Sequence, residues 1–412
     1  MDSSKKGLAF KVSRDFILSI LAIVIYNGVL QLVIYPGLNA RLGAEAFGTV
    51  LYFISAVSIM GAGFGTSASY GRIVAGKERN QSNGDYNIFL GIVALICILV
   101  SAVMVMVLGN GSETFASGSV AGTLSIFILM VITVIRYYCD VEYRMNIRFV
   151  DYCLFFLCVS IGYVAGLYLF DNWIFVILLG ELCGIIYTFV RGSILRSPFL
   201  QRSEAFADNI KAAFYISVGN LLSAFVLHAD RVILRLFTGA EEVTVFYTAS
   251  LMGKIVALLT TPLNGIIISY LAGYKIRLDR RKFLLSSALL MLVSLVLSVV
   301  CTGASYVFVK IMYPDVFPMA RDYFFLANLG QLLYFLSGTL MVVTLTFSEE
   351  KLQMIINGIY AAAFASIVLP LTIRLGISGM AWGLVIVNLF RFILTMILGL
   401  YQLSQERASS EG

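Results

Sequence analysis

The chain has little charge for its size. Only 13% of its 412 residues are charged, 60% are hydrophobic, and the mean hydropathy is +0.92. A soluble domain carries about 25% charged residues, so this composition excludes an ordinary soluble protein. It indicates a chain whose surroundings are largely lipid.

Metal ligands and catalytic groups are also scarce. The chain has one histidine, His228, and its six cysteines lie in or beside apolar segments without a C-x-x-C spacing. A zinc or catalytic metal site is therefore not expected. Because no nucleophile with a base, no paired carboxylates and no phosphate-binding glycine loop stand out, we predict no enzyme activity and no cofactor.

Long apolar runs fill most of the sequence. About 20 residues cross a hydrocarbon core of about 30 Å as a helix. A β-barrel would need short alternating strands instead, so the predicted fold is an all-α integral membrane protein. The first run exceeds a signal-peptide core and lacks a cleavage site, so we expect it to be retained. The twelve predicted spans are residues 14–36, 46–71, 86–108, 118–138, 148–170, 172–192, 210–237, 243–271, 283–306, 321–347, 352–374 and 378–403.

The basic residues predict an orientation. With a cytoplasmic N-terminus, most of the 29 Lys and Arg residues fall in inner segments, including Arg72 and Arg136. The outer loops then hold only Arg41, Lys310, Arg321 and Arg374. This bias predicts a membrane protein with both termini in the cytoplasm. It also explains the net charge of +6, so no nucleic-acid partner is expected.

The predicted spans divide into two lobes of six helices. The longest break, residues 193–209, separates an N-terminal lobe (1–200) from a C-terminal lobe (201–412). The tripeptide GAE follows the first span of each lobe, at 43–45 and 239–241. Because six is even, duplicated lobes would share one orientation, which is a parallel repeat with a substrate path between its halves.

Four stretches rich in glycine, arginine and aromatic residues carry a resemblance to a known family. They are YPGLNARLGAEAFG (35–48), GAGFGTSASYGRIVAGK (61–77), ADRVILRLFTGAEEVTVFYTASLMGK (229–254) and RLGISGMAWGLVIVNL (374–389). Through them the chain resembles the Wzx-like polysaccharide (O-antigen or capsule) repeat-unit flippases of the multidrug/oligosaccharidyl-lipid/polysaccharide exporter superfamily.

The resemblance implies a twelve-helix exporter that moves an undecaprenyl-diphosphate-linked oligosaccharide from the inner to the outer leaflet by alternating access. The partners it implies are that lipid-linked glycan, membrane lipids and the polysaccharide polymerase machinery. One departure concerns the cargo. The related lipid II flippases carry arginines within their first two helices, whereas the second predicted span here has no cation before Arg72. Lipid II is therefore a less favoured cargo.

Charged residues deep within the spans are the main candidate binding residues. A charge at bilayer depth is costly and normally faces a wet cavity or a partner. Lys254 and Arg391 lie about halfway along the eighth and twelfth spans, too deep for easy snorkelling. We predict that they contact the cargo diphosphate, although Arg391 is on a helix expected to be peripheral to the cavity. The alternative is a purely structural ion pair, for example Lys254 with Glu181.

A second cluster lies near the outer end of the seventh span, in FVLHADRVILRLFTGAEE (225–242). His228, Arg231 and Arg235 share one helical face, whereas Asp230 points about 100° away from Arg231. The cluster is either an outer-leaflet anchor with an interhelical pair or the rim or gate of a transport path.

Uncharged polar residues complete the candidates. Asn27 and Gln31 in the first span and Asn220 in the seventh could bond sugar hydroxyls or a neighbouring helix. Arg72, at the cytoplasmic end of the second span, could attract an anionic cargo or simply anchor that end. Pro262 with Asn264 predicts a kink in the eighth span.

Two other functions compete with the flippase. A cation-coupled drug or metabolite exporter of the same superfamily would need membrane-embedded carboxylates. The inventory of Glu181 and Asp230 against Lys254 and Arg391 favours an anionic cargo. A membrane glycan polymerase would need a sizeable loop bearing catalytic residues, and the predicted outer loops are too short for one.

Overall fold

The computed structural model describes residues 2–75, 80–108, 120–257, 264, 279–345 and 350–411. These residues are almost all helical, and no strand occurs among them. The predicted all-α fold class is therefore confirmed. The chain forms two compact units, Met1–Val232 and Ile233–Gly412, and the division falls inside helix α10 (Phe206–Phe237). The predicted lobe boundary near residue 200 stays a prediction.

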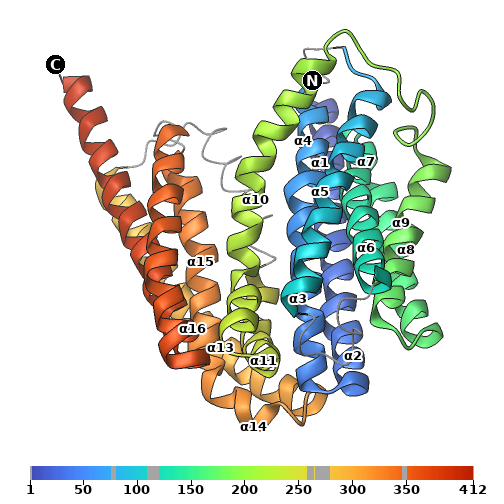
Figure 1. Ribbon diagram of the computed structural model, residues 1–412. Coiled ribbons are helices and arrows are strands. Elements are labelled where there is room, and N and C mark those ends of the chain that lie inside the picture. The colour runs from blue at the N-terminus through green and yellow to red at the C-terminus, as the bar shows by residue number, and fades with distance from the viewer. Residues whose placement is uncertain are drawn as a thin grey trace. The chain divides into compact units, whose positions relative to one another are not determined.

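The first unit is a bundle of long helices that lie side by side (Figure 1). Helix α8 packs on α1 and α9, and α6 packs on α5 and α9. The segment between α9 and α10 lies at the end of the unit where the chain begins (Figure 1). Its elements are α1 (Asp2–Val29), η1 (Leu30–Ile34), α2 (Tyr35–Leu42), α3 (Ala44–Met60), η2 (Gly61–Gly65), α4 (Thr66–Ala75), α5 (Asn83–Leu108), α6 (Val120–Cys139), α7 (Val141–Met145), α8 (Phe149–Leu169), α9 (Trp173–Arg191) and most of α10.

The second unit is built around one central helix. Helix α15 packs against α11, α13 and α16, and the short α14 packs at the ends of α11 and α13 (Figure 1). Its elements are the end of α10, α11 (Ala240–Ala257), α13 (Arg280–Met312), α14 (Phe317–Ala320), η3 (Arg321–Tyr323), α15 (Phe324–Leu345) and α16 (Glu350–Glu411).

The membrane spans follow the predicted pattern closely. Among the described residues, 10 helical segments are long and apolar enough to cross a membrane. The last segment, 355–404, breaks at Gly376 (φ 60°, ψ −134°), so it contains the two final predicted spans. Glycine suits this break because it adopts positive φ without a Cβ clash. The predicted eighth span begins in α11, and its part around Pro262 lies outside the described residues. The arrangement agrees with about twelve spans.

The first span is longer than predicted. It does not end at Pro36 but continues to Leu42 through the π-helical turn Leu30–Ile34. A proline can stand in the first turn of a helical segment because its missing N–H would have no partner there. The π turn ends directly before Tyr35, so Pro36 falls in the first turn of α2. The presence of Pro36 in the sequence does not by itself show that the helix continues.

The repeated GAE tripeptide performs the same task in both units. Gly43, at φ 79°, immediately precedes α3, and Gly239, at φ 159°, immediately precedes α11. In each case the glycine turns the chain and the following Ala-Glu pair opens a helix, where an acidic residue is favoured by the helix dipole. This is the local equivalence that a parallel repeat predicts.

Candidate functional site

A buried ion pair joins four helices of the first unit. The Arg136 Nε of α6 lies 2.6 Å from the Glu181 Oε2 of α9, and both side chains are only 3% exposed. Arg136 also donates to the Tyr26 hydroxyl of α1 at 3.0 Å, and the Tyr163 hydroxyl of α8 donates to Glu181. The guanidinium carbon lies 4.0 Å from the centre of the Tyr137 ring. The positive and negative charges are therefore neutralised within the network.

This network adds to the sequence analysis of Arg136. We predicted a cation at the cytoplasmic side, and the structure places Arg136 in the last turn of α6, buried among neighbouring helices. Arg136 neutralises the charge of Glu181. The sequence analysis had suggested Lys254 as the partner of Glu181. The missed signal was Glu181 itself, since a carboxylate in the middle of α9 requires a cation on a neighbouring helix.

Arg72 is another buried cation of the first unit. Its guanidinium donates to the Tyr138 hydroxyl of α6 and, at 2.6 Å, to the Asn83 Oδ1 at the start of α5. The guanidinium carbon also lies 5.4 Å from the centre of the Tyr86 ring. These contacts join α4, α5 and α6. A role for Arg72 in attracting the cargo stays a prediction.

Two carboxylates of the first unit form hydrogen bonds with the segment between α9 and α10 and with the start of α10. Glu142 Oε2 accepts from the backbone N–H groups of Ser193 and Ile194 at 3.0 and 3.1 Å. Asp85 accepts from the Ser203 hydroxyl at 2.6 Å and from the Asn209 amide at 3.0 Å. The segment between α9 and α10 is thus tied to α7 and to the start of α5.

The predicted cluster in α10 divides between local and interhelical contacts. Asp230 accepts from the backbone N–H of Arg231 at 2.9 Å, and the Arg231 guanidinium donates to the Ser55 hydroxyl of α3 at 3.2 Å. Both residues are buried, whereas His228 is half-buried. The Ser55 contact is what the interhelical reading of this cluster predicts. A role in a gate stays a prediction.

The amide candidates differ in how their polar atoms are used. Asn27 donates to the Ile23 carbonyl of its own helix at 2.9 Å, and Asn220 donates to the Ser67 hydroxyl of α4 at 2.9 Å. The Gln31 Oε1, in the π turn, is buried and has no hydrogen-bond partner among the described residues. Of the three, Gln31 therefore has the most capacity for an added ligand.

Arg391 in the second unit has surroundings quite unlike those of Arg136. It is 8% exposed. Its guanidinium carbon lies 4.8 Å from the centre of the Tyr334 ring of α15 and 4.9 Å from that of Tyr360 of α16. Its hydrogen bonds are long: 3.4 Å to Asn357 Oδ1 and 3.5 Å to the Tyr334 carbonyl. The Nε has no partner among the described residues.

The rings of Tyr334 and Tyr360 form an aromatic cage around the Arg391 guanidinium. Hydrogen bonds hold one of these rings, that of Tyr360, in place. The Tyr360 hydroxyl donates to Asn388 Oδ1 at 2.9 Å, and the Asn388 amide donates to the Gly330 carbonyl at 2.9 Å. Helices α15 and α16 therefore fix the ring of Tyr360 beside the guanidinium.

The sequence of the second unit places no carboxylate near the middle of a span. Those of its acidic residues that the structure describes lie at helix ends or in connections. They are Glu241, Glu242, Asp279, Asp315, Asp322, Glu350, Glu406 and Glu411. The charge of Arg391 is therefore met by aromatic faces and amide or carbonyl oxygens, and not by a carboxylate of its own unit.

Lys254 lies near the end of the described part of α11. It is half-buried, and its Nζ lies 6.0 Å from the centre of the Tyr247 ring. The preceding residue, Gly253, donates its backbone N–H to Asn328 Oδ1 of α15 at 2.6 Å. Lys254 and Arg391 thus belong to one unit, and Arg136 and Arg72 belong to the other.

Comparisons with known proteins bear on the fold. No protein-family model matches the sequence, and no curated protein matches it either. Solved structures do match over almost the whole chain. One is an inward-facing MATE-family multidrug resistance transporter of the MOP superfamily, with a TM-score of 0.66 and 12% identity over 95% of this chain and 99% of that one.

Two further matches have different described functions. The lipid II flippase MurJ, in an inward closed conformation, gives a TM-score of 0.62 with 14% identity over 94% of this chain and 86% of that one. A MOP superfamily transporter from Pyrococcus furiosus, described as having a binding pocket of reverse polarity, gives 0.57 with 12% identity over 95% of both chains. The chain therefore has the fold of the MOP superfamily transporters and is a multi-pass membrane protein.

Proposed function

We propose that this protein is a flippase that moves an undecaprenyl-diphosphate-linked oligosaccharide repeat unit from the inner to the outer leaflet of the bacterial cytoplasmic membrane. The observation that carries the proposal is the state of Arg391. It is a buried cation with weak hydrogen bonds and no carboxylate among its described contacts. Lys254 adds a second positive charge to the same unit.

An anionic cargo makes physical sense of this arrangement. A guanidinium has five N–H donors, and those of Arg391 make only long bonds to neutral oxygens. A diphosphate offers charged oxygens that accept shorter and stronger bonds. It also has to leave water to cross the membrane, so a cation already held in the protein offsets part of its desolvation.

The structural neighbours are compatible with such a cargo. One moves a lipid-linked substrate, lipid II, and another is described by a reversed pocket polarity. Within one fold, therefore, both lipid-linked cargo and a change of pocket charge have been described. These likenesses support a transport function, and the cargo is our proposal from the charges of this chain.

The proposed orientation places both termini in the cytoplasm. In the first unit, the N-terminal end of the chain and the segment between α9 and α10 lie at the same end (Figure 1). That segment and its flanks carry Arg191, Arg196 and Arg202. Cations concentrated at one end of a bundle mark the cytoplasmic side.

A cation-coupled drug exporter is the second candidate function. Its support is the pair of buried carboxylates Glu181 and Asp230, together with the MATE-family transporters among the neighbours. Such a mechanism would use one of these carboxylates to exchange a proton or a cation. The close contact of Glu181 with Arg136 argues against Glu181 in that role. Drug efflux that Glu181→Gln or Asp230→Asn abolishes, with unchanged protein level, would favour this alternative.

The test of the flippase is a deletion strain assayed for lipid-linked repeat units. We expect these units to accumulate at the inner leaflet and surface glycan to fall, with both reversed by the wild-type gene. Arg391→Ala should fail to restore glycan at a normal protein level, and Arg391→Lys should restore part of it. Arg374→Ala is the matched control, since it removes an exposed arginine from the other arm of α16, before the break at Gly376. Unchanged surface glycan in the deletion strain would contradict the proposal.

A further inference from the structure

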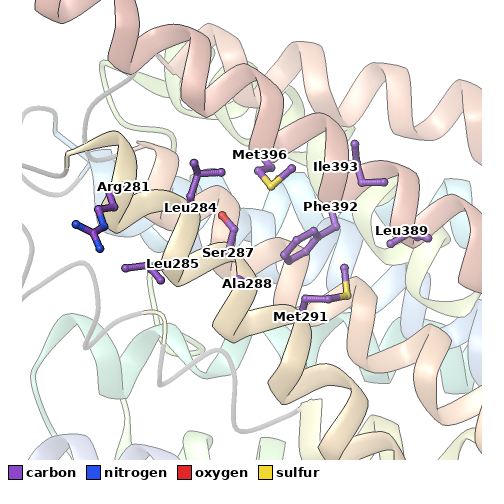
Figure 2. Close-up of a pocket in the computed structure, with 10 residues that line it drawn as sticks. All are labelled: Arg281, Leu284, Leu285, Ser287, Ala288, Met291, Leu389, Phe392, Ile393 and Met396. Carbon is purple, nitrogen blue, oxygen red and sulfur yellow. The ribbon is translucent and has the colours of Figure 1, made fainter.

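A groove lies between α13 and α16 in the second unit, and neither Arg391 nor Lys254 is among its lining residues. Its volume is about 570 Å³, within the range of about 300–1,000 Å³ that is typical of ligand sites. Figure 2 shows side chains of both helices facing it, with Arg281 at one end. The lining residues are Arg281, Leu284, Leu285, Ser287, Ala288, Met291, Leu389, Phe392, Ile393 and Met396.

The walls of the groove are apolar. Ser287 does not change this, because its hydroxyl donates to the Phe283 carbonyl of its own helix at 2.9 Å. The ring of Phe392 is buried, whereas Leu285 and Ile393 are exposed. The groove therefore exposes apolar side chains that could contact a lipid chain.

The length of the groove matches one leaflet. Arg281 and Met291 are ten residues apart on α13, which corresponds to about 15 Å at 1.5 Å per residue. That is half of a hydrocarbon core of about 30 Å. If α13 begins at a membrane surface, a groove of this length extends from that surface to near the bilayer centre, which is the path of one acyl chain.

The positive charge at the Arg281 end of the groove indicates which lipid head group would bind there. Arg281 stands between Arg280 and Lys282 in the first turn of α13. Cations are unfavourable at a helix N-terminus because the macrodipole is positive there, so this cluster does not stabilise the helix. Basic residues where a helix enters the membrane attract anionic lipids instead.

We infer that the groove binds an anionic phospholipid, with one acyl chain between α13 and α16 and the phosphate at Arg281. The inference needs only that α13 begins at a membrane surface, and it does not depend on the identity of the cargo. Because lining residues of both helices are exposed, a bound lipid would contact both and stabilise the packing of α13 on α16.

Native mass spectrometry of the purified full-length protein tests this inference. The probes are phosphatidylglycerol and phosphatidylethanolamine with identical acyl chains, titrated separately. We expect phosphatidylglycerol to bind more tightly and Arg281→Ala to weaken it about fivefold, the effect of one cation near an anionic surface. Ala288→Trp, which places a large ring in the groove, should reduce the binding of both lipids.

Lys310→Ala is the matched control, because it removes an exposed cation from the opposite end of α13, outside the groove and its basic cluster. It should leave the lipid affinities near wild type. An equal effect of Arg281→Ala and Lys310→Ala, or unchanged binding in Ala288→Trp, would overturn the inference. The lipids that co-purify with wild type and with Ala288→Trp give a further check. If the variant loses a bound polyprenyl phosphate and no phospholipid, the inference is wrong. None of these results depends on transport, so they are separable from a failure of the proposed function.

Discussion

The two units treat their buried cations in opposite ways. In the first unit, Arg136 is paired with Glu181 and bonded to tyrosines, so its charge is satisfied by the protein itself. In the second unit, Arg391 has two aromatic faces and long bonds to neutral oxygens. The first arrangement holds helices together, and the second leaves hydrogen-bonding capacity for a ligand. Both arginines are buried, so the proposal that Arg391 binds the cargo depends on the difference between their partners.

The largest stability effect should come from breaking the pair in the first unit. Arg136→Ala leaves Glu181 buried without its cation, and loss of one partner of a buried pair costs about 3–5 kcal/mol. We expect a large fall in the midpoint of thermal unfolding of the purified protein. The double variant Arg136→Met/Glu181→Met removes both charges and should regain most of this stability. A double variant as unstable as Arg136→Ala would contradict a purely structural role for the pair.

Arg72→Ala should have the next largest effect. It removes hydrogen bonds to Tyr138 and Asn83, and a bond that involves a charged group contributes about 1.5–3 kcal/mol. Both partners are neutral, so no uncompensated charge is left buried, as it is in Arg136→Ala. Because the guanidinium joins α4 to α5 and α6, we expect a lower unfolding midpoint and faster proteolysis near residue 80. Normal stability combined with lost transport would instead place Arg72 on the cargo path.

Arg391→Ala should reverse the pattern seen in the first unit. It removes two cation–π contacts, worth about 0.5–2 kcal/mol each, and leaves no buried carboxylate behind. We therefore expect a smaller loss of thermal stability than in Arg136→Ala, together with a complete loss of glycan export. Loss of stability as large as that of Arg136→Ala would remove the contrast between the units.

The smallest effect should come from removing the hydrogen bond that holds the Tyr360 ring beside Arg391. Tyr360→Phe keeps the aromatic face beside Arg391 but loses the hydrogen bond to Asn388, which contributes about 1 kcal/mol. Export should fall slightly, and Tyr360→Leu, which also removes the face, should reduce it further. Equal export by the two variants would show that the ring does not position the guanidinium.

The sequence was sufficient for the fold. Apolar runs of span length, separated by polar connections, located the helices, and the GAE tripeptides marked the starts of α3 and α11. The end of the first span was wrong because a π turn ahead of Pro36 lets the helix continue, and hydropathy does not report turn width.

The site was harder to predict because a hydropathy profile gives depth and not neighbours. Arg136 was expected in a cytoplasmic segment, since a charge near the end of an apolar run looks like a boundary. Only the packing of α6 on α9 shows that Glu181 is its partner. Arg391 was found by its depth alone, and the two tyrosines beside it come from α15 and α16, far from it in sequence.

The central claim is that the second unit holds a cation for an anionic, lipid-linked cargo. The most direct measurement compares the binding of undecaprenyl diphosphate and of undecaprenol to wild-type protein and to Arg391→Ala. The account predicts that wild type binds the diphosphate at least about tenfold more tightly, a difference of about 1.4 kcal/mol. Arg391→Ala should lose most of this preference while binding undecaprenol as before. An unchanged preference in a folded Arg391→Ala protein would contradict the account.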